Sequence, residues 1–390
     1  MVNSGALPMT GVSAPAGRLG KTVLAAVWMY GGRGIGLLWT LAVISRLGIA
    51  DYGLYAMGFA LAAIVCAPLD NPFNVRALRE SRERFLRERT TRVGVGLLLM
   101  AAGVAVIEVN YIAWFGLVVG GGELVFNAYK SQDLRDGHPD RVMRMDTVRQ
   151  ATSIAVATGY LFAVDHPTLL AASLFYAAPY FAVALLAVLV VRGHRPALPG
   201  PPRLVAALVL EHLGNALYIQ GDVLLLGFLT DSRIAGIYSV ASVLAWAVAA
   251  LGQSYVTTYH EPLRESGGDL ANGPAPKAIV TVSAVAGVLV LTVGIGLLLS
   301  PAPRELGIAM VLMSVFCGMR AANYVYTAVL YMQHRDLLRA WAAVGLVPVK
   351  LACVAALSPL GAVGAAIASV LTDAVLLGVY LKILYRGGGR

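Results

Sequence analysis

The residues of this 390-residue chain that could do chemistry are polar side chains inside long apolar runs. One run carries four of them at positions i, i+4, i+7 and i+11: Glu211, Asn215, Tyr218 and Asp222. Residues with this spacing share one face of a helix. Such a face avoids lipid, because polar groups in the membrane interior are costly unless they meet water or a partner. We therefore expect it to line a cavity, with Glu211 and Asp222 as candidates for binding a coupling proton or cation.

A later run carries a second polar stripe, which contains Arg320, Asn323 and Tyr324. Two stripes in the same half of the chain predict one wet cavity lined by both, in which these side chains contact a substrate. The alternative is a buried ion pair between Arg320 and an acid of the first stripe. Both interpretations hold together if the ion pair acts as a gate.

Arg33 is a further cation inside an apolar run. At 1.5 Å per residue it lies about 18 Å along a helix from Lys21, near the middle of a membrane. Four glycines lie close to it in the segment 30–36, and they would let the helix bend and bring its backbone near a ligand. We interpret Arg33 as a cavity residue rather than as the packing partner of an acid.

Other ionisable residues in apolar runs allow a structural interpretation. Lys350 and Asp373 fall in consecutive runs, so they could pair across a helical hairpin. Asp70 and Glu123 are candidates for gating, with a helix-end role as the alternative for Asp70. His212 is the one histidine inside a run, and a lone histidine does not make a metal site. We expect no catalytic residue, metal or other cofactor.

The composition indicates a membrane protein. The chain is 58% hydrophobic and 13% charged, with a mean hydropathy of +0.74, whereas soluble domains are about 25% charged. This excludes a soluble globular protein, a disordered chain and a coiled coil. The net charge of +9 resides in short loops, so it does not indicate nucleic-acid binding. The loops predicted on the outer side are too short to form an acceptor domain, so we expect a protein that is not an enzyme.

A membrane span needs about 20 apolar residues, and the sequence predicts twelve. They are 22–45, 52–74, 93–109, 110–129, 148–164, 167–191, 204–229, 233–258, 278–300, 306–331, 339–357 and 361–385. The loops 75–92 and 130–147 are both basic, so an even number of spans should separate them, with a turn near Asn110. One side of the membrane holds 24 of the 30 Lys and Arg residues, which predicts that both termini are cytoplasmic and that the protein lies in the inner membrane. The stretch 75–89 is expected to lie on the inner leaflet as a basic amphipathic anchor.

An internal repeat predicts two similar halves. At an offset of 183 residues, Gly53 matches Gly236 and Tyr55 matches Tyr238, at the outer end of the second helix of each half. The repeats then have the same orientation and are related by an axis along the membrane normal. We expect two six-helix lobes around a central cavity. The predicted segments are a flexible cytoplasmic tail (1–20), an N-lobe (21–191), a Pro/Gly-rich joint (192–203) and a C-lobe (204–390).

Three segments resemble Wzx-type polysaccharide flippases of the multidrug/oligosaccharidyl-lipid/polysaccharide exporter superfamily: 45–55, 222–229 followed by 235–238, and 360–368. The resemblance extends over nearly the whole chain. It implies transfer of a polyprenyl-diphosphate-linked oligosaccharide to the outer leaflet, with the diphosphate and sugars held in a cationic cavity. Arg33 matches a cationic position of the family, whereas Arg320 and Lys350 are our own candidates for the C-lobe. The chain lacks the two extra helices of lipid II flippases, so it does not match a lipid II role.

These observations together predict a flippase for cell-surface polysaccharide assembly that works by alternating access. Its expected partners are the lipid-linked glycan and the bilayer, a polysaccharide polymerase is a candidate partner, and no nucleic acid is expected. The first alternative is a cation-coupled multidrug exporter of the same fold. A major-facilitator transporter is disfavoured because the Gly, Asp and Arg signature of that class is missing from 75–92.

Overall fold

The computed structural model describes residues 34–386, so Arg33 and the predicted tail 1–20 lie outside the described residues. All regular secondary structure in this part of the chain is helical, and it contains no strand. A first helix is described from Gly34 to Leu47. The long helices that follow are α2 (Ile49–Ala77), α3 (Arg82–Ala105), α4 (Tyr111–Arg135), α5 (Pro139–Ala163), α6 (Leu169–Val191), α7 (Pro202–Leu229), α8 (Ser232–Thr257), α10 (Pro276–Leu298), α11 (Arg304–Met332), α12 (Asp336–Leu357) and α13 (Gly361–Leu381). The twelve predicted spans correspond to these helices in order, and the all-helical prediction is confirmed.

Seven stretches of the described chain are long and apolar enough to cross a membrane. Six of them are α2, α4, α6, α8, α10 and α11, and the seventh, Val344–Tyr385, joins most of α12 to α13. The helices α3, α5 and α7 fall short because charged and polar side chains interrupt their apolar residues. The protein is a multi-pass membrane protein with polar side chains built into its spans.

The connections between helices confirm one predicted turn and correct one predicted surface segment. Asn110 begins α4, and its side-chain oxygen accepts a hydrogen bond from the backbone N–H of Ala113 at 2.9 Å. The stretch 75–89 is not one continuous amphipathic helix, because α2 continues to Ala77 and α3 begins at Arg82. Glu88 and Arg89 of α3 are buried, and both form polar contacts inside the protein.

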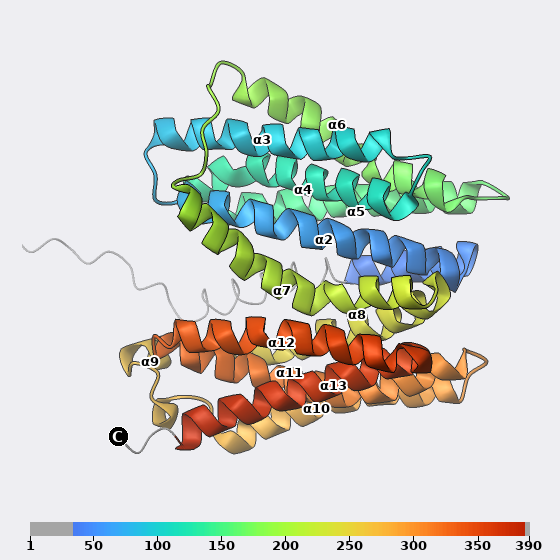
Figure 1. Cartoon of the computed structure of the whole chain (residues 1–390), viewed down its shortest axis with the longest axis vertical. Coiled ribbons are helices and arrows are strands. Elements are labelled where there is room, and N and C mark those ends of the chain that lie inside the picture. Colours follow the sequence, from blue (N-terminus) through green and yellow to red (C-terminus); the bar gives the residue numbers. More distant parts are fainter. Residues whose placement is uncertain (1–33, 387–390) are drawn as a thin grey trace, which may run out of the picture.

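The helices form two lobes (Figure 1). In the N-lobe, α2, α3 and α6 pack against α4, and α5 packs against α6. In the C-lobe, α10, α8 and α13 pack against α11, and α12 packs against α7 and α13. The lobes meet mainly where α2 contacts α7 and α8. We call the end of the molecule at which α2 ends and α3 begins the basic end, and the end at which α2 and α8 begin the opposite end.

At the opposite end, α2 and α8 cross at the two glycines that the internal repeat relates. A Cβ atom added to Gly53 would lie 1.7 Å from the carbonyl oxygen of Ser232 and 2.9 Å from the nitrogen of Gly236. A Cβ added to Gly236 would lie 2.3 Å from the carbonyl oxygen of Ile49. The two backbones are therefore in direct contact, which only glycine permits. Both glycines lie in the second turn of their helices, so the two halves run in the same direction, as the repeat predicted.

Candidate functional site

A cavity of about 480 Å³ lies between the lobes. Its aromatic lining consists of Trp39, Tyr52, Tyr55, Phe59, Tyr176, Trp246 and Tyr324, and its polar lining consists of Thr40, Gln150, Gln220, Ser239 and Ser242. These residues come from the first helix and α2, α5, α6, α7, α8 and α11, so both lobes contribute. None of the described lining residues is charged. The cavity wall therefore offers flat rings, amides and hydroxyls rather than ions.

The lining combines two kinds of surface. Tyrosine and tryptophan rings present apolar faces, whereas glutamine amides and serine hydroxyls can both donate and accept hydrogen bonds. A saccharide ring has the complementary surface, with C–H groups on its faces and hydroxyls at its edge. The same aromatic faces can also attract an organic cation, so the lining fits either a sugar or a cationic drug.

Arg320 and Asp373 form a buried ion pair behind the cavity wall, between α11 and α13. The Nε of Arg320 donates to one carboxylate oxygen of Asp373 at 2.9 Å, and its Nη2 contacts the other oxygen. The hydroxyl of Tyr218 donates to the same carboxylate at 2.8 Å. The Arg320 guanidinium also lies over the ring of Trp246, 4.6 Å from its centroid. Arg320 therefore supports a cavity aromatic but does not itself line the cavity.

Lys350 forms a second buried ion pair, with Asp222. Its ammonium nitrogen lies 2.5 Å from Asp222 Oδ2 and donates to the backbone oxygen of Tyr218 at 2.7 Å. Tyr238 donates its hydroxyl to the same Asp222 oxygen at 2.5 Å. The predicted Lys350–Asp373 pair does not form, and the predicted ion pair between Arg320 and the α7 stripe does not form either. Each cation pairs instead with the acid of a neighbouring helix, α7 for Lys350 and α13 for Arg320.

The two C-lobe ion pairs share Tyr218, whose hydroxyl contacts Asp373 and whose carbonyl contacts Lys350. The side chains of Asp222 and Asp373 are fully buried and that of Lys350 is 1% exposed. Breaking a buried pair by removing one partner typically costs about 3–5 kcal/mol. The C-lobe charges therefore hold α7, α11, α12 and α13 together.

The remaining predicted residues of the C-lobe lie in different environments. Asn323 is buried, and its Nδ2 donates to the backbone oxygen of Asp373 at 3.3 Å. Tyr324 lines the central cavity. Glu211 and Asn215 are exposed and belong to neither buried ion pair, so the predicted α7 stripe is divided into an exposed half and a buried half.

Asp70 is the centre of a buried polar cluster in the N-lobe. Arg92 of α3 donates from Nε to one of its oxygens at 2.6 Å. Asn74 and Asn127 donate to the other oxygen at 2.8 and 2.9 Å. The sequence places Arg92 in the basic loop 75–92, and nothing in the local composition distinguishes it from the arginines before it. A helix-end role does not describe Asp70, because its carboxylate links α2, α3 and α4.

Glu123 forms a further, partly buried cluster, with Arg149 of α5 and Tyr180 of α6. Its Oε1 lies 2.9 Å from Arg149 Nη2 and accepts the Tyr180 hydroxyl at 2.5 Å. Asp70 and Glu123 also line a second cavity of about 340 Å³ at the inner faces of α2 and α4. This second cavity shares Phe59 with the central cavity.

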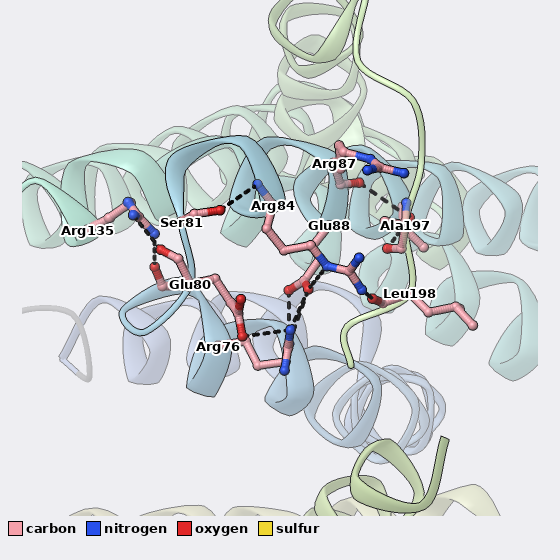
Figure 2. Close-up of polar contacts among 11 residues, drawn as sticks. Arg76, Glu80, Ser81, Arg84, Arg87, Glu88, Arg135, Ala197 and Leu198 are labelled. Carbon is pink, nitrogen blue, oxygen red and sulfur yellow. Dashed lines mark hydrogen bonds and ion pairs between the residues drawn. The ribbon is translucent and has the colours of Figure 1, made fainter. Parts of the chain in front are cut away.

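The segment that joins the lobes is fastened to the N-lobe (Figure 2). The hydroxyl of Thr91 accepts a hydrogen bond from the backbone N–H of Ala197 at 2.8 Å and donates to the Ala197 carbonyl at 2.7 Å. Arg84 bridges the same segment to α3, because it donates to the carbonyl of Leu198 and to Glu88, each at 2.9 Å. Residues 197–198 of the joint are therefore held on α3 before α7 begins.

Comparison with known proteins places the fold among transporters. No protein-family model matches the chain, and no curated protein matches it. Among solved structures, lipid II flippase MurJ in an inward closed conformation has a TM-score of 0.68 at 10% identity, covering 92% of this chain and 87% of that one. An inward-facing multidrug resistance MATE family transporter of the MOP superfamily has a TM-score of 0.61 at 12% identity, covering 92% and 96%. The MATE multidrug transporter DinF-BH has a TM-score of 0.59 at 13% identity, covering 96% of each chain. The chain thus has the two-lobed helical fold that MurJ and the MATE transporters share.

Proposed function

We propose that the protein is a flippase that moves a polyprenyl-diphosphate-linked oligosaccharide from the cytoplasmic to the outer leaflet for cell-surface polysaccharide assembly. The observation that carries this proposal is the central cavity, whose uncharged aromatic, amide and hydroxyl lining matches a saccharide and comes from both lobes. A cavity shared by two lobes can face either side of the membrane as the lobes rock against each other. The mechanism involves no covalent step.

The orientation follows from the distribution of charge. The segments that the sequence predicts on one side of the membrane hold 24 of the 30 Lys and Arg residues, and the α2–α3 connection at the basic end is one of them, so this end faces the cytoplasm by the positive-inside rule. In this orientation the protein lies in the inner membrane with both termini in the cytoplasm. The Gly53–Gly236 crossing then closes the outer side, and the lobes have to separate there to release the glycan.

The diphosphate needs a cation, and the three candidates are Arg320, Lys350 and Arg33. Arg320 and Lys350 are held in buried ion pairs behind the cavity wall, so their role is to position Trp246 and Tyr218. Arg33 remains the direct candidate, because it comes three residues before Gly36 in the sequence and Gly36 lines the cavity. A guanidinium can bind two diphosphate oxygens at once.

The second candidate function is a cation-coupled multidrug exporter. Its support is the same set of aromatic rings, which could stack on an organic cation, and the fold that the chain shares with MATE transporters. Its coupling candidates would be the exposed Glu211, the buried Asp222 and Asp70, and the partly exposed Glu123. Asp222, Asp70 and Glu123 already pair with a basic side chain, so a drug or an ion would have to compete with that partner.

Lipid analysis of cells depleted of the protein separates the two functions. The flippase proposal predicts that a polyprenyl-diphosphate glycan accumulates and that the corresponding surface polymer is lost. Mass spectrometry of the lipid extract would also identify the sugar. An unchanged glycolipid pool together with greater sensitivity to cationic drugs would instead support the exporter.

A further inference from the structure

His212 occupies an unusual position in the second cavity, between the lobes. Every other residue that lines this cavity comes from α2 or α4 of the N-lobe, whereas His212 projects from α7 of the C-lobe. The cavity carries two carboxylates, those of Asp70 and Glu123. A titratable side chain of one lobe therefore shares an internal space with acids of the other lobe.

One ring nitrogen of His212 has no hydrogen-bond partner among the described residues. This nitrogen, Nδ1, is buried. One turn earlier in α7, the carbonyl of Leu208 accepts a hydrogen bond from Asn71 of α2 at 3.1 Å. Leu208 and His212 are four residues apart, so they lie on the same helix face. Any change in the attraction between His212 and α2 therefore acts where the lobes already touch.

Acidic and amide side chains surround the cavity that His212 enters. Cys66, Asn71 and Asn74 face the cavity from α2 together with Asp70, and Asn127 faces it from α4 together with Glu123. The pairing arginines, Arg92 and Arg149, do not line the cavity. On its own helix, His212 is next to the exposed Glu211. An imidazolium here would face carboxylate and amide oxygens, with the arginine charges behind them.

We propose that His212 is the proton-binding residue of the transport cycle, and that its protonation draws α7 onto α2 and α4 and closes the basic end. This inference rests on the proposed function for its place in the cycle. Imidazole changes its charge between about pH 5 and pH 8, and its cation carries two N–H donors. The proton enters at a ring nitrogen, and the charge that it adds is attracted by the carboxylates across the cavity. When the proton leaves, this attraction is lost and the lobes separate at the basic end.

The test measures the separation of the lobes directly, without a substrate. Leu78 and Leu204 are exposed residues near the basic ends of α2 and α7. In the full-length protein, with the three native cysteines replaced, each is changed to cysteine and spin-labelled. Double electron–electron resonance then measures the distance between the two labels. The proposal predicts shorter distances at about pH 5 than at about pH 8. The His212→Gln variant should show the longer distances at both pH values. His194→Gln, which alters an exposed histidine of the loop between the lobes, should respond as the parent does.

Two outcomes overturn the proposal. A parent protein whose distances do not change between the two pH values has no proton-driven closure, whatever the variants do. A His212→Gln protein that keeps the full response places the titrating group elsewhere. Because no glycolipid is needed, a failure here leaves the flippase proposal intact, and a failure of the lipid analysis leaves this measurement valid.

Discussion

Replacing Gly53 by alanine should separate the lobes at the opposite end. The added methyl carbon would lie 1.7 Å from the carbonyl oxygen of Ser232, where ordinary contact begins at 3.4 Å. The helices α2 and α8 therefore have to separate by about 1.7 Å at this crossing. The atoms in the way are backbone atoms, so no side chain can rotate to make room.

The size of the effect follows from the cost of overpacking. Inserting a methyl group into a packed contact typically costs about 1–3 kcal/mol, and a contact between two backbones lies at the upper end. A cost of about 3 kcal/mol corresponds to roughly a hundredfold loss in the population of the closed state. We expect Gly53→Ala and Gly236→Ala to fold, to populate the outward-open state and to lose most of their transport.

Spin labels at the opposite end measure this shift. Val109 and Leu299 are highly exposed residues at that end, in the N-lobe and the C-lobe respectively. Their distance distribution should move to longer values in Gly53→Ala. Gly159→Ala is the matched control, because a Cβ at this helical glycine meets no atom within 4 Å. A Gly53→Ala protein with the parent's distances and the parent's stability would refute the idea that this crossing is the outer closure.

Two further predictions concern the stability of the C-lobe and the attachment of the joint between the lobes. Asp373→Asn leaves Arg320 without its buried counter-charge, so the free energy of unfolding should fall by about 3–5 kcal/mol and the midpoint of thermal unfolding should fall with it; an unchanged midpoint would show that the ion pair is dispensable. Thr91→Val removes both hydrogen bonds to Ala197, each worth about 1 kcal/mol, so trypsin should cleave the joint faster. Thr90→Val is the control, because the Thr90 hydroxyl bonds only within its own helix, and equal cleavage of the two variants would mean that Thr91 does not fasten the joint.

Much of the fold could be predicted from the sequence because apolar run length and loop charge are local properties. The basic loops on either side of 93–129 required two spans there, and Asn110 marked the turn between them because an asparagine side chain can accept the first backbone N–H groups of a helix. The offset of 183 residues related Gly53 to Gly236. That the two glycines touch could not be predicted, because an internal repeat gives equivalence and not proximity.

The ion pairs could not be predicted for a different reason. Arg92 and Arg149 lie close to the middle of their helices, but in the sequence they directly follow the arginines of the basic segments and resemble them. In the structure Arg92 is buried against Asp70, and Arg149 pairs with Glu123. The partners of Arg320 and Lys350 depend on which helices are neighbours in space, and a single sequence does not state that α12 lies beside α7. Polar stripes locate the costly side chains, whereas helix packing decides which of them neutralise one another.

The measurement that tests the central claim most directly is a flipping assay with the purified full-length protein. Lipid-linked glycan extracted from the depleted cells would be incorporated into vesicles, and a membrane-impermeant reagent would report how much of it faces outward. The account predicts that wild-type protein makes the inward-facing glycan accessible and that Arg33→Ala, although folded, does not. Equal accessibility with and without the wild-type protein would contradict the account.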